Sequence, residues 1–166
     1  MYSHTSNIAI YGFMGAGKTT LASSISRTLE VPHIDLDREI ERRHQRSIPE
    51  IFAQFGERFF RQCEQDTLSL LATSQTKHVL SLGGGTLLAK INAQVVQRLY
   101  RLFTLIVPFD VVRARIENSQ RPLREVARER YLEREQHYLS VGTPLYIAKE
   151  NPEGMETLFW KMYYAS

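Results

Sequence analysis

Cysteine is almost missing from this sequence: Cys63 is the only one among 166 residues, so no internal disulfide can form. No set of cysteines and histidines has the spacing of a zinc site. The longest nearly continuous apolar run, about 102–109, is far shorter than the roughly 20 residues that span a bilayer. The opening residues also lack the basic start and apolar stretch of a signal peptide. These absences predict a cytoplasmic enzyme or binding domain without a membrane partner, in which Cys63 is a buried or half-buried helix residue.

Compositional bias is absent as well. Hydrophobic residues make up 43% and charged residues 23%, close to ordinary globular values, which excludes a disordered or collagen-like chain. No internal repeat, low-complexity tract or linker is present. A chain of this length suits one domain. We therefore predict a single domain over residues 1–166.

Strong charge of one sign is also missing. The net charge is +3, which suits acidic small-molecule ligands and supports nucleic-acid binding only weakly. Seven arginines lie between residues 113 and 134, but glutamates are interleaved with them. We expect most of these arginines to form ion pairs on solvated helices, and we expect no nucleic-acid partner.

Short apolar runs alternate with helical patterns along the chain. Ser47 and Glu50 form a capping box that starts one helix. Strands alternating with helices predict an α/β fold with a parallel sheet flanked by helices on both faces, whose ligands lie at the carboxyl ends of the strands. The predicted strands are 7–11, 31–35, 78–82, 102–107 and 145–147, and the other predicted helices are 17–30, 37–44, 57–72, 92–99, 109–117 and 123–139.

The stretch Gly12–Thr19, GFMGAGKT, matches the phosphate-binding pattern G-x-x-x-x-G-K-[ST] in full, between a predicted strand and a predicted helix. Its glycines let successive amides point inward as an anion nest, and the helix N-terminus adds its dipole. Lys18 would place its charge at the β- and γ-phosphates, and the Thr19 hydroxyl would bind Mg²⁺. The alternative is a glycine-rich turn without a ligand.

The class of nucleotide site follows from two missing motifs. N-K-x-D, which reads guanine, and D-x-x-G, which forms a GTPase switch, occur nowhere in the chain. An ATP site of a small kinase is therefore indicated. Its predicted ATP-binding residues are Gly15, Ala16, Gly17, Lys18, Thr19 and Thr20.

Asp35 and Asp37 close the second predicted strand as D-x-D. Alternate residues of a strand point the same way, so we expect both carboxylates to face one site. One would support the magnesium shell, and the other would accept a proton from an attacking hydroxyl, which is what phosphoryl transfer needs. In the alternative interpretation, Asp37 only caps the next helix.

The chain resembles the shikimate kinase family over about residues 7–142. The motifs that carry the resemblance are, in order, GFMGAGKTT, HIDLD, FGERFFRQCE, SLGGG, RPL and R-x-x-x-Y. The resemblance implies a three-layer P-loop kinase fold with a mobile lid at about 113–125 and substrate-binding helices at about 36–72. It also implies phosphorylation of the 3-hydroxyl of shikimate by ATP with Mg²⁺, in a monomer.

Roles on the phosphoryl side follow from the same resemblance. Asp37 matches the aspartate that holds the shikimate hydroxyls and takes the proton, and Asp35 matches the one beside magnesium. Arg121 matches the lid arginine that reaches the ATP phosphates, so Asp37, Lys18 and Arg121 form the predicted catalytic set. Because Arg121 precedes Pro122, it is expected in an extended or turn segment that can swing over the nucleotide.

Substrate binding is expected from a later group of residues. The resemblance assigns Arg61 and Arg134 to the shikimate carboxylate, which planar guanidinium groups grip with two hydrogen bonds. Backbone contact with the substrate is expected from the glycine triplet, Gly83, Gly84 and Gly85. The alternative for Arg61 is an ion pair with Glu57 or Glu64 of its own helix, where Glu64 would orient it.

Two other functions remain open from the sequence. One is another small-molecule kinase of the same fold, of the gluconate or nucleotide type. The other is a P-loop binding module without turnover. The tail after residue 150 matches no motif of the family, and its aromatics Phe159, Trp160 and Tyr163 are expected to pack rather than to bind.

Overall fold

One parallel sheet organises the protein in this computed structural model, which describes residues 7–117, 127–147 and 154–165. The strand order is β2-β3-β1-β4-β5, and every neighbouring pair runs parallel. The predicted parallel α/β sheet is therefore confirmed. The strands are β1 (Asn7–Gly12), β2 (His33–Asp35), β3 (Val79–Ser81), β4 (Tyr100–Ile106) and β5 (Thr143–Tyr146).

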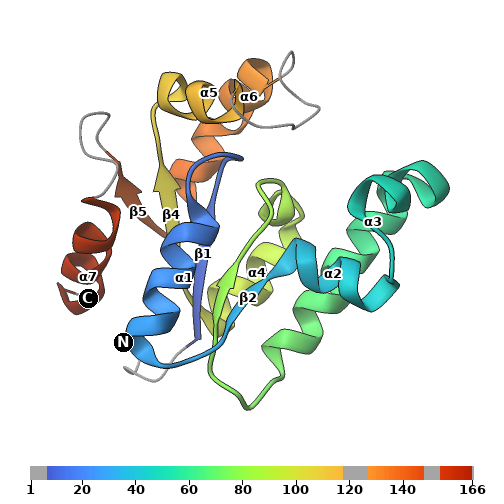
Figure 1. Cartoon of the computed structure of the whole chain (residues 1–166), viewed down its shortest axis with the longest axis horizontal. Coiled ribbons are helices and arrows are strands. Elements are labelled where there is room, and N and C mark those ends of the chain that lie inside the picture. Colours follow the sequence, from blue (N-terminus) through green and yellow to red (C-terminus); the bar gives the residue numbers. More distant parts are fainter. Residues whose placement is uncertain (1–6, 118–126, 148–153, 166) are drawn as a thin grey trace.

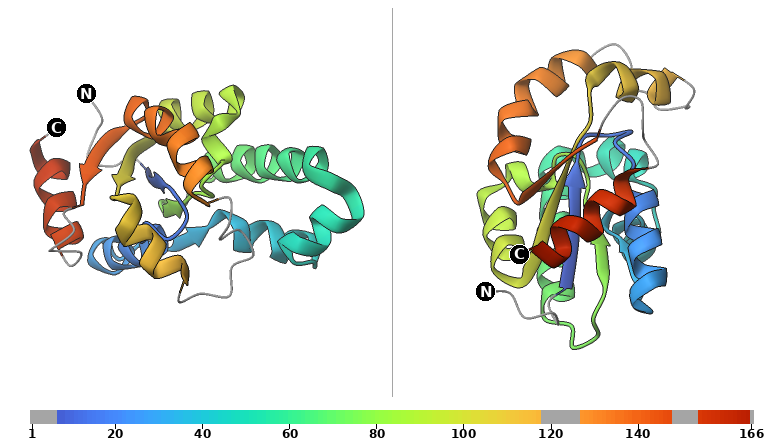
Figure 2. Two further views of the ribbon diagram at one scale, coloured as in Figure 1. Left: turned by 90° about the horizontal axis from the view of Figure 1, so that it is seen from above. Right: turned by 90° about the vertical axis from the view of Figure 1, so that its left-hand side faces the viewer.

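Helices cover both faces of this sheet, which confirms the predicted three layers. Helices α1 and α7 pack together on one face, and α4 and α6 contact β4 on the other (Figure 2). Helices α2 and α3 lie to one side, while α5 and α6 stand at the end where the strands stop (Figure 1). The helices are α1 (Lys18–Leu29), α2 (Leu36–His44), α3 (Ile48–Ala72), α4 (Lys90–Leu99), α5 (Phe109–Glu117), α6 (Ala127–Ser140) and α7 (Met155–Ala165), with a 3₁₀ turn at Thr86–Leu88.

Burial on both faces explains the composition of the central strand. In β1, every residue from Ile8 to Gly12 is buried. Its partners are β3 and β4, with Ile8 paired to Val79 on one side and to Arg101 on the other. A strand covered on both faces carries a continuous apolar run rather than an alternating one. Strand β1 is therefore a rigid base for the loop that follows it.

Helix α3 is bent at a glycine. The predicted capping box is confirmed, since Ser47 accepts from the Glu50 amide and Glu50 accepts from the Ser47 amide. Gly56 interrupts the helix with φ 76° and ψ 177°, a backbone conformation in the left-handed half of φ that L side chains rarely adopt. The helix predicted from residue 57 begins directly after this break. The bend lets one continuous element change direction beside α2, which it contacts.

The C-terminal helix α7 is an element that the sequence patterns did not predict. Phe159 and Tyr163 are buried, and the Phe159 ring lies 4.8 Å from that of Phe103 in β4. Arg101 donates to the carbonyl oxygens of Met162 and Tyr163, which ties the end of the helix to the sheet. The expectation that the tail aromatics pack is confirmed. None of the helices in the described ranges has the length and apolar character needed to cross a bilayer.

Candidate functional site

The phosphate-binding loop follows β1 and leads directly into α1. Gly17 caps the helix with φ 98°, and Gly15 has φ 75°, so side chains at either position would strain the backbone. The Lys18 amine donates to the Phe13 carbonyl oxygen over 2.9 Å, which holds its charge across the loop. The loop therefore presents a cation and the N-terminus of α1 to the same point, as an anion site requires.

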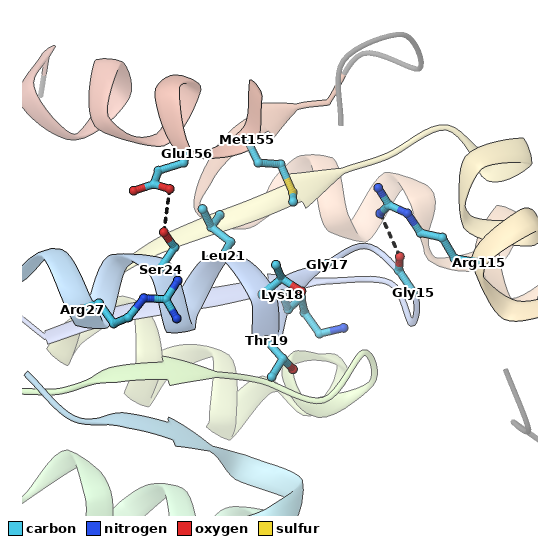
Figure 3. Close-up of a pocket in the computed structure, with 11 residues that line it drawn as sticks. Gly15, Gly17, Lys18, Thr19, Leu21, Ser24, Arg27, Arg115, Met155 and Glu156 are labelled. Carbon is cyan, nitrogen blue, oxygen red and sulfur yellow. Dashed lines mark hydrogen bonds between the residues drawn. The ribbon is translucent and has the colours of Figure 1, made fainter. Parts of the chain in front are cut away.

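A cavity of about 580 Å³, here called the P-loop pocket, opens beside this loop (Figure 3). Lys18, Thr19 and Thr20, three of the predicted ATP-binding residues, line it, while the side chain of Ala16 is buried, with 1% exposed. Its lining residues are Gly15, Gly17, Lys18, Thr19, Thr20, Leu21, Ser24, Arg27, Arg115, Met155 and Glu156.

Two residues that line the P-loop pocket, Arg115 and Glu156, were not identified from the sequence. Arg115 of α5 donates to the carbonyl oxygens of Gly15 and Ala16 over 3.1 and 3.2 Å. Glu156 of α7 faces Ser24 of α1 and accepts its hydroxyl over 2.6 Å (Figure 3). Arg115 stands among interleaved arginines and glutamates, and Glu156 lies in a helix without a motif. No sequence signal distinguished either residue.

A second cavity of about 450 Å³, here called the clamp pocket, lies on the other side of Lys18 and Thr19. These two residues line both pockets, so the two cavities meet at the phosphate-binding loop. The other lining residues of the clamp pocket are Phe13, Met14, Asp35, Asp37, Arg38, Phe52, Phe60, Arg61, Glu64, Leu82, Gly83, Gly84, Gly85, Arg130 and Arg134.

Asp35 and Asp37 both reach the clamp pocket, but the route differs from the predicted one. Asp35 ends β2 and caps α2, where its Oδ1 accepts from the Arg38 amide over 3.2 Å. Asp37 lies in the first turn of α2, so strand alternation does not bring the two carboxylates together. The alternative in which Asp37 is the helix cap is also wrong, because Asp35 occupies that position.

Asp37 is the carboxylate best suited to take a proton. Burial, together with the negative charges of Asp35 and Glu64, raises its pKa to about 6 against the opposing effect of Lys18. A general base works best with a pKa near the working pH, where its ionised form is available and still attracts a proton. Asp37 therefore has the electrostatic setting of a base beside the phosphate-binding loop.

A hydroxyl and a carboxylate lie together where the two pockets meet. Thr19 Oγ1 donates to Asp35 Oδ2 over 3.1 Å, and Ser81 Oγ donates to the same oxygen over 2.9 Å. Mg²⁺ prefers such oxygen ligands and is usually held by one or two protein groups together with phosphates and waters. Within the described ranges, no three histidines, cysteines or carboxylates gather to hold a metal alone. Thr19 and Asp35 thus fit a magnesium ion shared with nucleotide phosphates.

Arg61 is paired within its own helix and also faces the clamp pocket. It donates to Glu64 Oε2 over 2.6 Å and to Glu57 Oε1 over 3.0 Å, which confirms the pairing foreseen as the alternative. Glu64 is 1% exposed, and its second oxygen accepts the Thr86 hydroxyl over 2.7 Å. Burial disfavours the charge on Arg61, but the hydrogen bonds and charges of Glu64 and Glu57 outweigh it and raise the pKa of Arg61. Arg61 is an oriented, permanent cation.

The glycine triplet brings Arg61 and Arg134 to one point. A methyl group placed on Gly85 would lie 3.4 Å from both terminal nitrogens of Arg61 and 3.6 Å from Nη1 of Arg134. A methyl on Gly83 would lie 2.9 Å from the Thr86 hydroxyl and 3.1 Å from Asp37 Oδ1. The backbone here therefore lies close to the Asp37 carboxylate on one side and to two guanidinium groups on the other.

One predicted residue cannot be placed. Arg121 and most of the predicted lid, residues 118–125, lie outside the described residues. The described part of that segment, 113–117, is the last part of α5. The other predicted site residues are brought together at the carboxyl ends of β1, β2 and β3, where a parallel sheet places its ligands.

Curated relatives of this chain include shikimate kinases. The chain is 51% identical to the shikimate kinase of Geobacillus thermodenitrificans over 82 residues, which are 49% of this chain and only 44% of that protein's length. It is 37% identical to the shikimate kinase of Cereibacter sphaeroides over 152 residues, which cover 89% of this chain and 75% of that protein.

Solved structures and a family model agree with these relatives. A shikimate kinase from Acinetobacter baumannii, solved in complex with shikimate, has a TM-score of 0.88 and 26% identity, covering 98% of this chain and 94% of that one. The family model for shikimate kinase matches residues 14–151, from the phosphate-binding loop to the segment before α7. The resemblance read from the motifs is thus confirmed, and the chain belongs to the shikimate kinase family.

Proposed function

We propose that this chain transfers the γ-phosphoryl group of ATP to the 3-hydroxyl of shikimate, giving shikimate 3-phosphate and ADP. The observation that carries the proposal is the meeting of two pockets at Lys18 and Thr19. One pocket has the phosphate-binding loop, and the other has a carboxylate with a pKa near 6 and two convergent guanidinium groups. Family membership and the shikimate-bound relative support the same substrate.

The phosphates of ATP would be held at the P-loop pocket. The glycine-rich loop and the N-terminus of α1 attract the phosphate oxygens, and Lys18 adds a positive charge between the pockets. Phosphoryl transfer relies mainly on positioning and charge stabilisation, which these groups supply. We assign Arg121, from the lid, to the developing charge on the phosphates.

Thr19 and Asp35 are the residues that would hold Mg²⁺. A bound ion would supply positive charge that offsets the negative charge of the phosphate oxygens during transfer. The Thr19 hydroxyl supplies one oxygen, and Asp35 supports the metal or its waters. Ser81, which donates to Asp35 Oδ2, keeps that carboxylate in place.

Asp37 is proposed as the base for the acceptor alcohol. Its carboxylate takes the proton of the shikimate 3-hydroxyl while that oxygen forms a bond to the γ-phosphorus. The bond between the γ-phosphorus and the bridging oxygen breaks, and the electron pair leaves on ADP. Lys18, which lines both pockets, stays next to the charge throughout the transfer.

Arg61 and Arg134 are proposed to bind the carboxylate of shikimate. Two planar guanidinium groups around one point fix both the position and the orientation of a carboxylate. The glycine triplet, with Gly84 as its middle residue, allows the hydroxylated ring of shikimate to approach the backbone. The carboxylate clamp disfavours nucleotide acceptors, and the glycine triplet together with family membership favours shikimate over gluconate.

The remaining partner and assembly predictions also belong to this proposal. ATP and shikimate are its proposed small-molecule partners. A monomer is its proposed assembly state, because residues around the strand ends of a single chain are enough to line the site. Size-exclusion chromatography with light scattering measures the assembly. A cytoplasmic location stays a prediction from the sequence.

The decisive test is ADP release from ATP in the presence of Mg²⁺ with different acceptors. We expect release with shikimate and none above background with gluconate or nucleoside monophosphates, and phosphorus NMR should show a new phosphate monoester. Release with one of the other acceptors would assign the chain to another small-molecule kinase. ATP binding without a single turnover on shikimate would indicate the binding module.

A further inference from the structure

Two tyrosine hydroxyls converge on the carbonyl oxygen of Gly84, the middle residue of the glycine triplet. Tyr138 of α6 donates to this oxygen over 2.6 Å, and Tyr11 of β1 donates to it over 3.3 Å. The two donors come from elements that are far from Gly84 in the sequence. The roles assigned above to the glycine triplet use neither hydroxyl.

The orientation of this carbonyl decides where the next amide points. In a planar trans peptide, the N–H of Gly85 points opposite to the C=O of Gly84, and no cis bond occurs in the described chain. The Gly85 N–H therefore points away from the two tyrosines. No described residue accepts a hydrogen bond from the amide of Gly84 or Gly85. These two amides are available to a ligand.

We propose that Tyr138 and Tyr11 are positioning residues that hold the Gly84–Gly85 peptide so that its N–H faces the substrate in the clamp pocket. The inference rests on the proposed function, because it deepens the role given to the glycine triplet. Tyr138 makes the shorter contact and is the main residue. Tyr11 adds a second, longer hydrogen bond to the same oxygen.

The surroundings of both hydroxyls make them persistent donors. Tyr11 is 0% exposed and Tyr138 is 3% exposed, and their rings lie 5.1 Å apart. Burial raises the pKa of Tyr138 to about 12 and also raises that of Tyr11, so both keep their protons near neutral pH. Rigid, buried donors of this kind fix a backbone group at little cost in entropy.

Helix α6 acts on both sides of the triplet. Tyr138 and Arg134 are four residues apart and therefore neighbours on one helix face. Tyr138 contacts the carbonyl oxygen of Gly84, while Nη1 of Arg134 lies 3.6 Å from a methyl placed on Gly85. The helix thus couples the carboxylate clamp to the backbone donor.

The experiment removes single hydroxyls and keeps the rings. Tyr138→Phe and Tyr11→Phe are compared with the parent and with Tyr100→Phe as a matched control. Tyr100 is also 0% exposed, and its hydroxyl is hydrogen-bonded to His78 over 2.9 Å, but it lies at the opposite end of the strands. The three variants lose the same atom from the same kind of environment. Steady-state assays then give kcat and the KM of each substrate.

We expect Tyr138→Phe to raise the KM for shikimate about five- to tenfold, the loss of roughly one buried hydrogen bond, with the KM for ATP unchanged. Tyr11→Phe should raise it about twofold, because its hydrogen bond is longer. Tyr100→Phe should lower the melting temperature without changing either KM. The proposal is overturned if Tyr138→Phe behaves like Tyr100→Phe, or if it weakens both substrates equally.

A readout independent of activity separates this inference from the proposed function. The chain has nine glycines, so a glycine-labelled ¹⁵N NMR spectrum is simple enough to resolve Gly85. In the ligand-free protein, we expect its amide signal to move in Tyr138→Phe and to stay in Tyr100→Phe. If the parent did not phosphorylate shikimate, the proposed function would fail while this spectrum still tested the hydrogen bonds. An unmoved Gly85 signal would contradict the inference.

Discussion

The P-loop pocket and the clamp pocket share Lys18 and Thr19 but are built in opposite ways. The first is built on a continuous segment that presents backbone amides and a helix N-terminus, to which we assign most of the phosphate binding. The second collects side chains from α2, α3 and α6 around the glycine triplet after β3. A backbone cradle recognises any nucleotide phosphate, whereas a set of placed charges selects one acceptor. Substitutions should therefore affect the two pockets differently.

Lys18 belongs to both pockets, so its loss should have the largest effect. Lys18→Met removes the charge between the phosphates and the acceptor, and kcat should fall about a thousandfold. Circular dichroism and the melting temperature should stay close to those of the parent. Lys77→Met, at an exposed loop position, is the matched control and should keep full activity. A Lys18→Met enzyme with more than a tenth of the parent's kcat would contradict the assignment.

A substitution of Asp37 should slow the chemical step while leaving nucleotide binding intact. Asp37→Asn keeps the shape of the side chain but removes the base, so kcat should fall about a hundredfold while calorimetry still detects ATP. Asp66→Asn, an exposed carboxylate on α3, controls for the loss of one negative charge. Loss of ATP binding in Asp37→Asn would place this residue in the nucleotide site instead.

A substitution of Arg61 should weaken binding in the clamp pocket and leave binding in the P-loop pocket unchanged. Arg61→Lys keeps the charge but cannot make two parallel hydrogen bonds, so the KM for shikimate should rise about tenfold while the KM for ATP stays unchanged. Arg58→Lys, an exposed neighbour on α3, is the control. Equal kcat/KM for Arg61→Lys and the parent would show that the carboxylate lies elsewhere.

The raised pKa of Asp37 predicts a pH dependence with a defined sign. The ionised form is the base, so kcat/KM for shikimate should fall as the pH drops through about 6. Folding stability should change in the opposite direction. A carboxyl whose folded pKa lies above its unfolded value of 3.8 stabilises the fold fully below that value, and this contribution is lost as the pH rises through about 6.

The same linkage predicts a change in folding stability. At pH 7 the buried negative charge of Asp37 costs roughly 3 kcal/mol, because its pKa of about 6 lies well above the ordinary 3.8. Asp37→Asn should therefore unfold at higher denaturant concentration than the parent at pH 7, and the difference should shrink by pH 5. Urea titrations at both pH values measure it. A variant less stable than the parent at pH 7 would contradict the assigned electrostatics.

Much of the fold was predictable because its signals are local. The apolar run of β1, the capping box at Ser47 and Glu50, and the alternation of strands and helices each depend on neighbouring residues. Helix α7 was missed because its helical residues carry aromatics on several sides and no recognised cap. Its position follows from contacts with Phe103 and Arg101, which no local pattern reveals.

The candidate site divides in the same way. The predicted Asp35 and Asp37 do reach one pocket, but Asp37 does so from the first turn of α2, since Asp35 ends the strand and caps the helix. Arg115 contacts the phosphate-binding loop, but the sequence did not identify it because it lies in a stretch of mixed charge. The hydrogen bond from Thr86 to the buried Glu64 joins two elements that are distant in sequence, and no sequence motif predicts it.

The amino-acid sequence by itself determined the phosphate-binding loop, because glycines, a lysine and a helix start within eight consecutive positions dictate their own geometry. It also carried the family, since the ordered motifs extend over most of the chain. Only the tertiary structure decided how closely Arg61 and Arg134 approach Gly85 and how strongly burial raises the pKa of Asp37. Those properties depend on distances and solvent exclusion between elements that are far apart in sequence, which packing alone establishes.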